Sequence, residues 1–491
     1  MLKGRRGYTM RLKKILDMIV VDKKINFKNY NIKAITHNSK DVIKDSIFIA
    51  ISGSEFNGNN YINDAVKLGA KCIVTEQEIY MENVCVIIVK NARKTMSMMA
   101  KNFYNKVCDS MTIIGVIGTS GKTTTTHIIK ELICSNDNNI GIIGTNGIYI
   151  DNIRLDNNFT TPDPLELHYA LYQMKMLGVN TVVMEVSAQA IIQYKMCGIR
   201  LRIGVFTNIT SEHLDFFGSM EKYVKTKMDY FNISNMDEAI INVDDFYGRE
   251  IAYKANLPVV SYGVEAPANV FAVDIISSME RLRFVVNALD DVYSIDTRLV
   301  GKYNVYNIMS AITVAKLLGV DRKDIFDRVN NLHLIDGRFN VYKYYKANVI
   351  IDFAHTVDSI DRLLSFVYEN KQGKIITLFG CVGYSDREKR RKMTDAVLKY
   401  SDYMIITTDN RGETPFAEIE NDMVDGVSID RYTAIEDRKS AIIFGLNMLQ
   451  DNDTLVIMGK GAENYQKIGK EKIPYSDIDI VQELIKKTDV K

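Results

Sequence analysis

The sequence predicts an α/β protein with three domains. Its 491 residues correspond to roughly three domains at about 150 residues each. Runs that are apolar at every position alternate with stretches of helical spacing, and such runs are typical of parallel strands buried on both faces. We therefore expect mostly parallel sheets covered by helices, in domains that span residues 1–108, 109–332 and 333–491.

The first domain, residues 1–108, has the pattern of a small α/β unit. Strands are expected over 45–51 and 71–75, and an amphipathic helix over 61–68. The N-terminal stretch is basic and then apolar, but Asp17 interrupts the apolar part and Asp22 ends it. It therefore lacks the pattern of a signal peptide.

The central domain, residues 109–332, is predicted to contain a mostly parallel sheet of the P-loop type. Its buried strands are expected in MTIIGVIG, NIGIIGT, VNTVVMEVS, RIGVFTNI and EAIINVDD. Apolar and polar residues then alternate in VFAVDI, RLRFVV and YSIDT, which predicts a small antiparallel appendage on this domain. Helical spacing resumes over 304–318.

The C-terminal domain, residues 333–491, is predicted to be a Rossmann-like α/β unit. Its strands are expected in NVIIDFAH, KIITLFG, DYMIITTDN and TLVIMGKG, and each run ends in polar residues or glycine. Ligands of open α/β sheets bind at the carboxyl ends of the strands. We therefore expect ligand-binding residues at these ends.

A glycine-rich segment follows the first central strand and precedes a helical period. It consists of Gly118, Thr119, Ser120, Gly121, Lys122, Thr123 and Thr124. In such a loop, backbone N–H groups and a lysine hold the phosphates of a nucleotide, and a hydroxyl coordinates Mg²⁺. The segment therefore predicts ATP binding, with Lys122 on the phosphates and Thr123 on the metal.

The loop IGTSGKTTT resembles that of the Mur ligases, which are ATP-dependent, amide-forming enzymes of cell-wall precursor synthesis. The N-terminal stretch around Asn38-Ser39-Lys40 is similar to the family's uridine-nucleotide domain, and Gly459-Lys460-Gly461 is similar to its C-terminal signature. Further motifs match in order: Thr160-Thr161-Pro162, Met184-Glu185-Val186-Ser187, Thr207-Asn208-Ile209, Glu212-His213-Leu214-Asp215, Asn304-Val305-Tyr306-Asn307, Gly337-Arg338-Phe339 and Asp352-Phe353-Ala354-His355-Thr356. The resemblance covers nearly the whole chain.

Within the family, the chain most resembles the members that add the third peptide residue. The resemblance implies a ligase that acts on UDP-N-acetylmuramoyl-L-alanyl-D-glutamate through an acyl phosphate and releases ADP and phosphate. It also implies a place in peptidoglycan synthesis, and thus in cell shape and division. The added amino acid is expected to be meso-diaminopimelate, with L-lysine as the alternative.

The resemblance also implies roles for individual residues. Lys122, Glu185, His213 and Lys227 match catalytic positions, and Lys227 matches a lysine that the family carbamylates. Mg²⁺ would be held by Thr123, Glu185, His213 and carbamylated Lys227. Adenine, phosphate and ribose of ATP would contact Asn307, Arg338 and Asp352 respectively.

Two further groups of residues match the family's substrate contacts. The UDP-muramoyl dipeptide would contact Ser39, Thr160, Thr161, Ser187, Gln193 and Lys195. The incoming amino acid would contact Asp409, Asn410, Arg411, Gly459 and Glu463.

The sequence departs from the family pattern mainly near the predicted amino-acid pocket. The proline that usually precedes the loop arginine is missing before Arg411, and Ser385 stands where an arginine is expected. Arg387, two residues later, is the candidate to replace that arginine. Elsewhere, Gln189 replaces a histidine and Lys195 replaces an arginine, which keeps the charge but loses the bidentate fork.

Composition restricts the partners and the compartment. Lys plus Arg number 62 and Asp plus Glu number 61, so no excess positive field is available to hold nucleic acid or an anionic membrane. No apolar window is long enough for a membrane span. The 6 cysteines include no C-x-x-C pair, which is typical of a reducing cytosol. We expect a cytoplasmic monomer whose partners are the UDP-linked dipeptide and an amino acid.

Three alternatives remain at the level of the sequence. A ligase of the folylpolyglutamate-synthetase or cyanophycin type would share the loop and the lysine but take another acceptor; the uridine-domain match argues against it. A P-loop ATPase or kinase would need a Walker B aspartate, where this chain has Glu185. A non-catalytic relative is disfavoured because Lys122, Glu185, His213 and Lys227 are all present.

Overall fold

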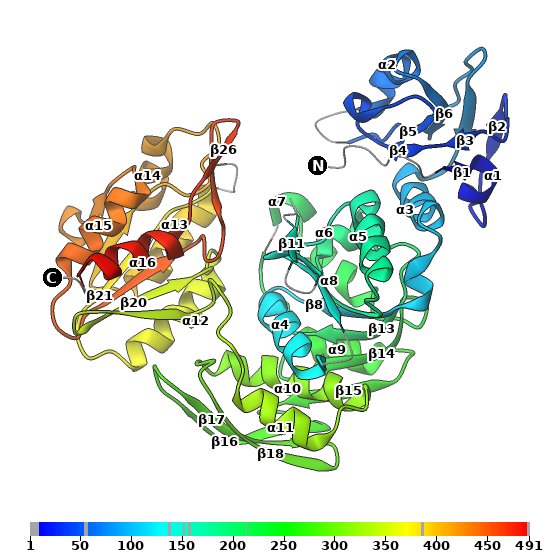
Figure 1. Cartoon of the computed structure of the whole chain (residues 1–491). Coiled ribbons are helices and arrows are strands. Elements are labelled where there is room, and N and C mark those ends of the chain that lie inside the picture. The colour runs from blue at the N-terminus through cyan, green and yellow to red at the C-terminus, as the bar shows by residue number, and fades with distance from the viewer. Residues whose placement is uncertain are drawn as a thin grey trace.

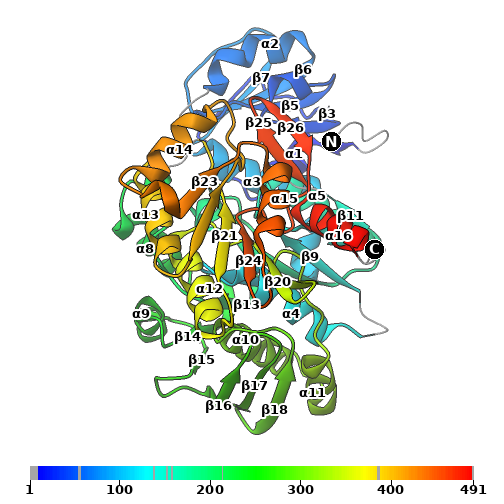
Figure 2. The ribbon, with the colours of Figure 1, turned by 90° about the vertical axis from the view of Figure 1, so that its left-hand side faces the viewer.

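The computed structural model describes residues 9–53, 57–135, 139–150, 153–155, 159–212, 214–383 and 387–488. Three bodies follow one another along the chain, each with its own sheet and covering helices (Figure 1). The β16–β18 end of the central body lies at the side opposite the N-terminal body in both ribbon views (Figure 2). The predicted three-domain α/β fold is confirmed.

The N-terminal body contains a small, mostly parallel sheet in the order β2-β7-β6-β5-β4, of which only the β2–β7 pair is antiparallel. Helices α1, α2 and α3 pack around it, and a short ladder of β1 with β3 lies beside it. The bounds are β1 Met10–Arg11, α1 Leu12–Ile15, β2 Lys23–Ile25, β3 Asn31–Ile32, β4 Ala34–Thr36, β5 Ser46–Ile49, α2 Ile62–Lys67, β6 Ala70–Thr75, β7 Cys85–Ile88 and α3 Ala92–Phe103.

Within the described residues, the central body is built on one 11-stranded sheet in the order β11-β10-β9-β12-β8-β13-β14-β15-β16-β17-β18. Pairs from β9 to β16 are parallel. The strand bounds are β8 Thr112–Ile117, β9 Ile140–Gly144, β10 Gly147–Ile150, β11 Ile153–Leu155, β12 Thr181–Val186, β13 Leu201–Phe206, β14 Met236–Asn242, β15 Val259–Gly263, β16 Val270–Ser277, β17 Leu282–Ala288 and β18 Asp291–Thr297.

The predicted antiparallel appendage is not a separate layer. Strands β16, β17 and β18 pair antiparallel with one another, and β15 joins them to the parallel sheet through Tyr262 and Gly263. The helices of this body are α4 Lys122–Ile133, α5 Pro164–Met176, α6 Ala188–Ile192, α7 Leu214–Phe217, α8 Met220–Met228, α9 Phe246–Lys254, α10 Tyr303–Leu317 and α11 Arg322–Asn330.

Burial on both faces explains the uninterrupted apolar runs of the central strands. In β8, Ile113 and Ile117 belong to the apolar cluster on one face of the sheet, and Ile114 and Val116 belong to the cluster on the other. A parallel strand with helices on both faces has no solvent-facing side, so its side chains do not alternate in polarity.

The C-terminal body has a sheet in the order β19-β20-β24-β21-β22-β23, parallel except for the edge strand β19. A β25–β26 hairpin and five helices accompany it in the described part of the chain. The bounds are β19 Asn340–Tyr344, β20 Ala347–Asp352, α12 Val357–Glu369, β21 Ile375–Phe379, α13 Arg387–Leu398, β22 Tyr403–Ile406, α14 Phe416–Val424, β23 Tyr432–Ala434, α15 Arg438–Met448, β24 Thr454–Met458, β25 Tyr465–Ile468, β26 Glu471–Pro474 and α16 Asp477–Thr488.

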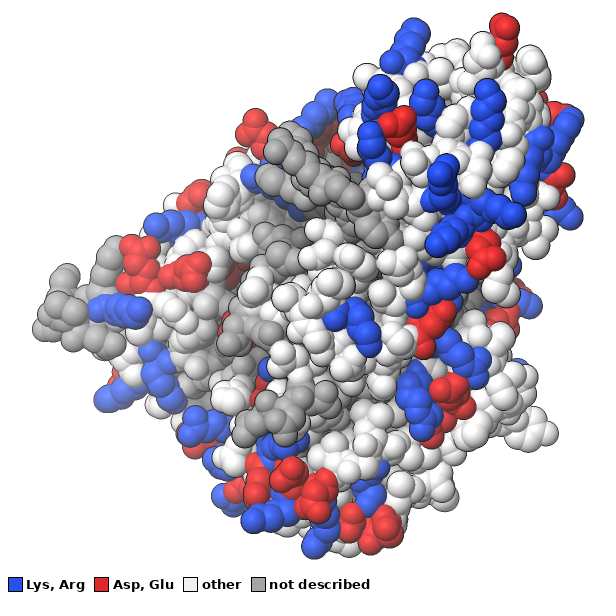
Figure 3. Space-filling view, turned by 45° about the vertical axis from the view of Figure 1, so that its right-hand side comes forward, with Lys and Arg blue, Asp and Glu red and all other residues white. Residues whose placement is uncertain are grey.

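The surface carries mixed charges, in agreement with the formal net charge of +1. On the face shown in Figure 3, Lys and Arg lie among Asp and Glu over much of the surface and gather toward the upper right. Among the described residues, no helix is both long enough and apolar enough to cross a bilayer.

Candidate active site

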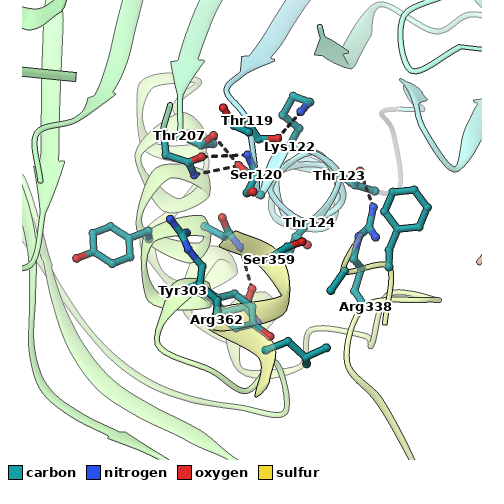
Figure 4. A pocket seen from close by; sticks show the side chains of 18 of the residues that line it. Thr119, Ser120, Lys122, Thr123, Thr124, Thr207, Tyr303, Arg338, Ser359 and Arg362 are labelled. Atoms are coloured by element: carbon teal, nitrogen blue, oxygen red, sulfur yellow. Dashed lines mark hydrogen bonds between the residues drawn. The ribbon is translucent and has the colours of Figure 1, made fainter. Parts of the chain in front are cut away.

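The phosphate loop connects β8 to α4 and depends on two glycines. A Cβ on Gly118 would lie 1.9 Å from Thr207 Oγ1, so only glycine fits there. Gly121 has a φ of +85°, a left-handed conformation that favours glycine. The Lys122 ammonium donates to the Gly118 carbonyl at 3.0 Å. It also donates to the Thr119 carbonyl at 2.7 Å (Figure 4). The loop is therefore held in a fixed shape at the N-terminus of α4.

Residues after β13 brace the same loop. Thr207 Oγ1 donates to the Ser120 carbonyl at 2.8 Å, and the Asn208 amide donates to that carbonyl at 3.1 Å. Asn208 Oδ1 in turn accepts from the Ser120 N–H at 3.0 Å. The Thr-Asn-Ile motif thus supports the loop from the neighbouring strand.

The loop opens onto a cavity of about 690 Å³ that two bodies share. The central body contributes Thr119 to Thr124 and Asn307, and the C-terminal body contributes Arg338 and Asp352. This volume lies in the range of small-molecule and cofactor sites. The predicted ATP residues other than Gly118 therefore line one cavity, although they lie far apart in sequence.

Asn307 and Arg338 each contact the segment that carries the loop. Asn307 Oδ1 accepts from Thr125 Oγ1 at 3.2 Å. Arg338 donates to Thr123 Oγ1 at 3.1 Å, and its guanidinium lies 4.5 Å from the centroid of the Phe353 ring. This Arg338–Thr123 contact joins the C-terminal body to the phosphate loop.

Glu185, at the end of β12, is 1% exposed and accepts three hydrogen bonds. Its Oε1 accepts from Thr123 Oγ1 at 2.9 Å and from the Thr145 N–H at 2.8 Å, and its Oε2 accepts from Thr145 Oγ1 at 3.1 Å. A Cβ on Gly144 would lie 2.3 Å from Oε1, so Glu185 requires glycine there. Thr145 is absent from the sequence-based site, although it is the last residue of the predicted strand NIGIIGT.

Glu185 and Thr123 suit Mg²⁺. Mg²⁺ prefers hard oxygen donors and is usually held by one or two carboxylates together with substrate phosphates and waters. The buried carboxylate and the loop hydroxyl lie side by side, next to the cavity. Among the described residues, no group of three or more His, Cys, Asp or Glu side chains is placed to hold a metal ion. His213, a predicted ligand, lies outside the described residues.

Lys227, on α8, is fully buried beneath the loop. Its Nζ donates to Thr119 Oγ1 at 3.0 Å and to the Tyr223 hydroxyl. Burial, with a smaller effect of the nearby Lys122 ammonium, holds the pKa of Lys227 well below its usual value. The neutral amine is thus favoured at this position.

His355 lines the same cavity from the C-terminal body. Its Nε2 lies 3.8 Å from Glu212 Oε1 of the central body, and its Nδ1 lies 2.8 Å from the Phe353 carbonyl. It therefore forms, with the Arg338–Thr123 contact, a second link across the cavity.

The residues predicted to contact the dipeptide lie in three places. Thr161 Oγ1 donates to the Glu185 carbonyl at 2.9 Å and accepts from the Ser187 N–H at 3.0 Å. Thr160 Oγ1 lies 3.0 Å from Thr145 Oγ1, and the Lys195 ammonium contacts the Thr161 carbonyl at 3.3 Å. These residues surround Glu185. Two others lie elsewhere: Gln193 at the end of α6, and Ser39 in a 3-10 turn, Ser39–Asp41, of the N-terminal body.

Lys195 keeps its charge paired. Its Nζ lies 2.8 Å from Asp163 Oδ1 and 4.3 Å from the centroid of the Phe159 ring. An ammonium can therefore be held where the family usually has arginine.

The residues predicted to bind the amino acid meet at the ends of β22 and β24. Asn410 donates to Glu463 Oε2 at 2.9 Å, and a Cβ on Gly459 would lie 3.0 Å from Asp409 Oδ2. Arg411 instead donates to the Thr414 carbonyl at 3.1 Å. A further residue in this cluster, Lys460, is absent from the sequence-based site.

Arg387 contacts carboxylates of α14. Its guanidinium pairs with Glu418 and lies 3.9 Å from Asp422. Its replacement of the missing arginine stays a prediction. Ser385 lies outside the described residues.

Three family models match the chain. They are the Mur ligase family, catalytic domain, over residues 31–104, the Mur ligase middle domain over 116–315, and the Mur ligase, glutamate ligase domain, over 337–461.

Individual relatives match over nearly the whole length. A UDP-N-acetylmuramoyl-L-alanyl-D-glutamate--2,6-diaminopimelate ligase of Aquifex aeolicus is 36% identical over 94% of this chain and 95% of its own. The enzyme of the same name from Alkaliphilus oremlandii is 35% identical over 97% and 99%. A solved structure of a ligase of that name has a TM-score of 0.69 and 27% identity, and the match covers 98% of this chain and 99% of the other. The chain belongs to the Mur ligase family.

Proposed function

We propose that this chain is an ATP-dependent ligase that joins 2,6-diaminopimelate to UDP-N-acetylmuramoyl-L-alanyl-D-glutamate. The observation that carries the proposal is the shared cavity, in which the phosphate loop, Glu185 and Arg338 adjoin the Thr160 and Thr161 region. The full-length relatives of that name support the choice of substrates. The reaction belongs to peptidoglycan precursor synthesis.

The reaction proceeds in two transfers. The γ-phosphate of ATP passes to a carboxylate of the dipeptide, which forms an acyl phosphate and ADP. The amine of the amino acid then attacks the acyl carbon, an amide bond forms, and phosphate leaves with the electron pair of the broken C–O bond. Positioning and charge neutralisation are what the protein supplies in phosphoryl transfer.

Five of the predicted ATP residues have an assigned part in that positioning. Lys122 exchanges its loop carbonyls for the β- and γ-phosphates, and Arg338 approaches the phosphates from the C-terminal body. Asn307 and Asp352 hold the adenine and the ribose. Thr123 and Glu185, together with His213, would hold Mg²⁺, which would supply positive charge to neutralise the phosphate oxygens.

Carbamylation of Lys227 is part of the proposal. A neutral amine can attack carbon dioxide, which forms an N–C bond and releases one proton to solvent. The product is an anion, and it would lie near Lys122, whose positive charge stabilises it. The burial of Lys227 and its lowered pKa support this step because both favour the reactive neutral amine.

Substrate contacts complete the assignment. We assign the dipeptide to Ser39, Thr160, Thr161, Ser187, Gln193 and Lys195, and the amino acid to Asp409, Asn410, Arg411, Gly459 and Glu463. The domain boundaries, a cytoplasmic location and a monomeric state stay predictions.

Phosphate release with UDP-N-acetylmuramoyl-L-alanyl-D-glutamate, ATP and one amino acid at a time tests the function. We expect release to depend on all three substrates and to be faster with meso-diaminopimelate than with L-lysine. Faster release with L-lysine would contradict the choice of amino acid. No phosphate release with either amino acid would contradict the proposed acceptor and would favour a Mur-superfamily ligase with another substrate.

A further inference from the structure

Lys460 lies at the centre of the predicted amino-acid site, with no exposed surface. Its Nζ lies 2.8 Å from Glu463 Oε2, 3.2 Å from Asn410 Oδ1 and 3.5 Å from Asp409 Oδ1. One buried ammonium therefore contacts three of the five residues assigned to the amino acid.

Lys460 fixes the orientation of the Asn410 amide. Asn410 Oδ1 accepts from Lys460 Nζ and from the Lys467 N–H at 2.8 Å, so its Nδ2 is turned to donate to Glu463. Both ends of the amide are thereby satisfied, which excludes the flipped rotamer. Loss of the ammonium would release this arrangement.

Lys460 is itself attached to a rigid part of the fold. It follows β24, whose last carbonyl, Met458 O, accepts from Arg438 at 2.8 Å. Arg438 also forms a fully buried ion pair with Asp477 at 2.7 Å. The backbone that leads into Lys460 is thus anchored at the end of β24.

The charges of this cluster bear on which amino acid it accepts. Asp409 and Glu463 carry two negative charges and Lys460 carries one positive charge, so these three side chains sum to −1. The guanidinium of Arg411, which donates to the Thr414 carbonyl, is a second positive charge of the assigned site. The far end of diaminopimelate carries an ammonium and a carboxylate, whereas that of lysine carries an ammonium alone. A positive charge beside the site disfavours the more cationic ligand.

We propose that Lys460 is a specificity-determining positioning residue, which orients Asn410 and Glu463 and biases the site toward an amino acid with a zwitterionic far end. This inference rests on the proposed function, since it concerns the amino acid of that reaction. Removal of the positive charge should shift the preference toward lysine.

The test is the ratio of kcat/KM for meso-diaminopimelate to kcat/KM for L-lysine in Lys460→Met. We expect this ratio to fall at least about tenfold, because the variant leaves two carboxylates without their buried counter-charge. The ratio does not depend on the fraction of folded protein. Lys460→Arg, which keeps the charge, should stay within about threefold of the wild-type ratio.

Lys316→Met is the matched control. Lys316 is also mostly buried and contacts two carboxylates, Asp290 at 2.7 Å and Asp291, but it lies in the central body. Its loss should leave the ratio unchanged. Trapping of the acyl phosphate with hydroxylamine, without amino acid, provides a second readout, which should be unchanged in Lys460→Met because the amino acid enters later.

The outcomes separate the two proposals. If the wild type is active and the ratio of the two kcat/KM values is the same in Lys460→Met, the inference about Lys460 is wrong and the proposed function is unaffected. If both Lys460→Met and Lys460→Arg fail to form hydroxamate, the inference is also wrong, because the lysine would then be needed for the fold and not for the choice of amino acid. A wild type that releases no phosphate with either amino acid overturns the proposed function and this inference with it.

Discussion

At the scale of single residues, the buried lysines of this protein differ in what surrounds their ammonium groups. Lys195 and Lys460 each contact carboxylates, Asp163 in one case and Glu463 in the other. Lys227 donates instead to the hydroxyls of Thr119 and Tyr223. A buried ammonium is stable when a carboxylate pairs with it, and otherwise the neutral form is favoured. This contrast singles out Lys227 as the lysine suited to react with carbon dioxide.

Lys227→Ala should be nearly inactive and should recover part of its activity when formate or acetate is added. A short carboxylate can occupy the space of the carbamate and restore the negative charge beside Lys122. The measurement is ADP release with and without the added acid. Lys225→Ala, an exposed lysine of the same helix, should behave as wild type. An alanine variant at position 227 with full activity would refute the carbamate.

Lys122→Ala should abolish ADP release and leave the fold intact. Among the described residues, the Lys122 ammonium donates hydrogen bonds only to the loop carbonyls of Gly118 and Thr119. Its loss therefore leaves no buried carboxylate without a counter-charge. Far-ultraviolet circular dichroism and ADP release measure the two effects. Lys130→Ala, in the last turn of α4, is the control. Turnover near the wild-type rate in Lys122→Ala would mean that the loop does not hold the phosphates.

The sequence predicted the residues of the site that carry charge or belong to a motif. Glu185 and Lys122 are of this kind. It did not predict Thr145, because a single threonine after a strand carries no distinctive chemistry until a carboxylate is seen to accept its hydrogen bonds. Lys460 was hidden for another reason: a lysine between two glycines looks exposed in sequence, and its ammonium meets Asp409 and Asn410, which lie about fifty positions away along the chain.

At the scale of elements, strands with a long apolar run or a clear alternation of apolar and polar residues were predictable, and short strands without either pattern were not. The run MTIIGVIG became β8, and the run TLVIMGKG became β24. Strand β15 was missed because only part of it is buried, and β23 because it is short and half-buried throughout. The continuity of the antiparallel strands with the parallel sheet was also missed, since a period of two does not say which strands are neighbours.

Helix α5 carries a histidine that should make stability depend on pH. His168 is 1% exposed, its Nε2 has no hydrogen-bond partner among the residues that the structure describes, and burial lowers its pKa to about 3. An unfolded histidine titrates near 6.5. Between these values the unfolded chain binds a proton that the folded chain does not bind. The contribution of His168 to the free energy of unfolding is thus fully present above pH 6.5. It decreases as the pH falls below this value, by up to about 1.4 kcal/mol per pH unit.

His168→Leu should therefore flatten the acid side of the stability profile. The measurement is the midpoint of thermal unfolding at half-unit steps from pH 7 to pH 4, for the wild type and the variant. His333→Leu, which alters a histidine whose side chain is 85% exposed, should leave the profile unchanged. An equal slope in His168→Leu and wild type would show that another group governs the acid transition.

At the scale of the whole molecule, the cavity depends on how the central and C-terminal bodies meet. The Arg338–Thr123 contact joins residues 215 positions apart, and His355 lies 3.8 Å from Glu212 of the other body. Hydrophobic periods and motifs predict the elements within a domain but not how two domains pack against each other. This geometry could therefore be learned only from the structure. It implies that a nucleotide in the cavity contacts both bodies and stabilises their association.

Arg338→Ala should weaken binding of ADP with Mg²⁺ about ten- to a hundredfold, because a hydrogen bond to a charged group contributes about 1.5–3 kcal/mol. Isothermal titration calorimetry measures the affinity, and Arg322→Ala, an exposed arginine on α11, is the control. Saturating nucleotide should also raise the free energy of unfolding, by about 2.7 kcal/mol at a hundred times the dissociation constant. At that same nucleotide concentration, the free energy of unfolding of Arg338→Ala should rise less than that of the wild type, because the variant binds the nucleotide more weakly. Wild-type affinity for ADP in Arg338→Ala would mean that Arg338 does not contact the nucleotide. The C-terminal body would then contribute to the cavity only through its contacts with the other substrates.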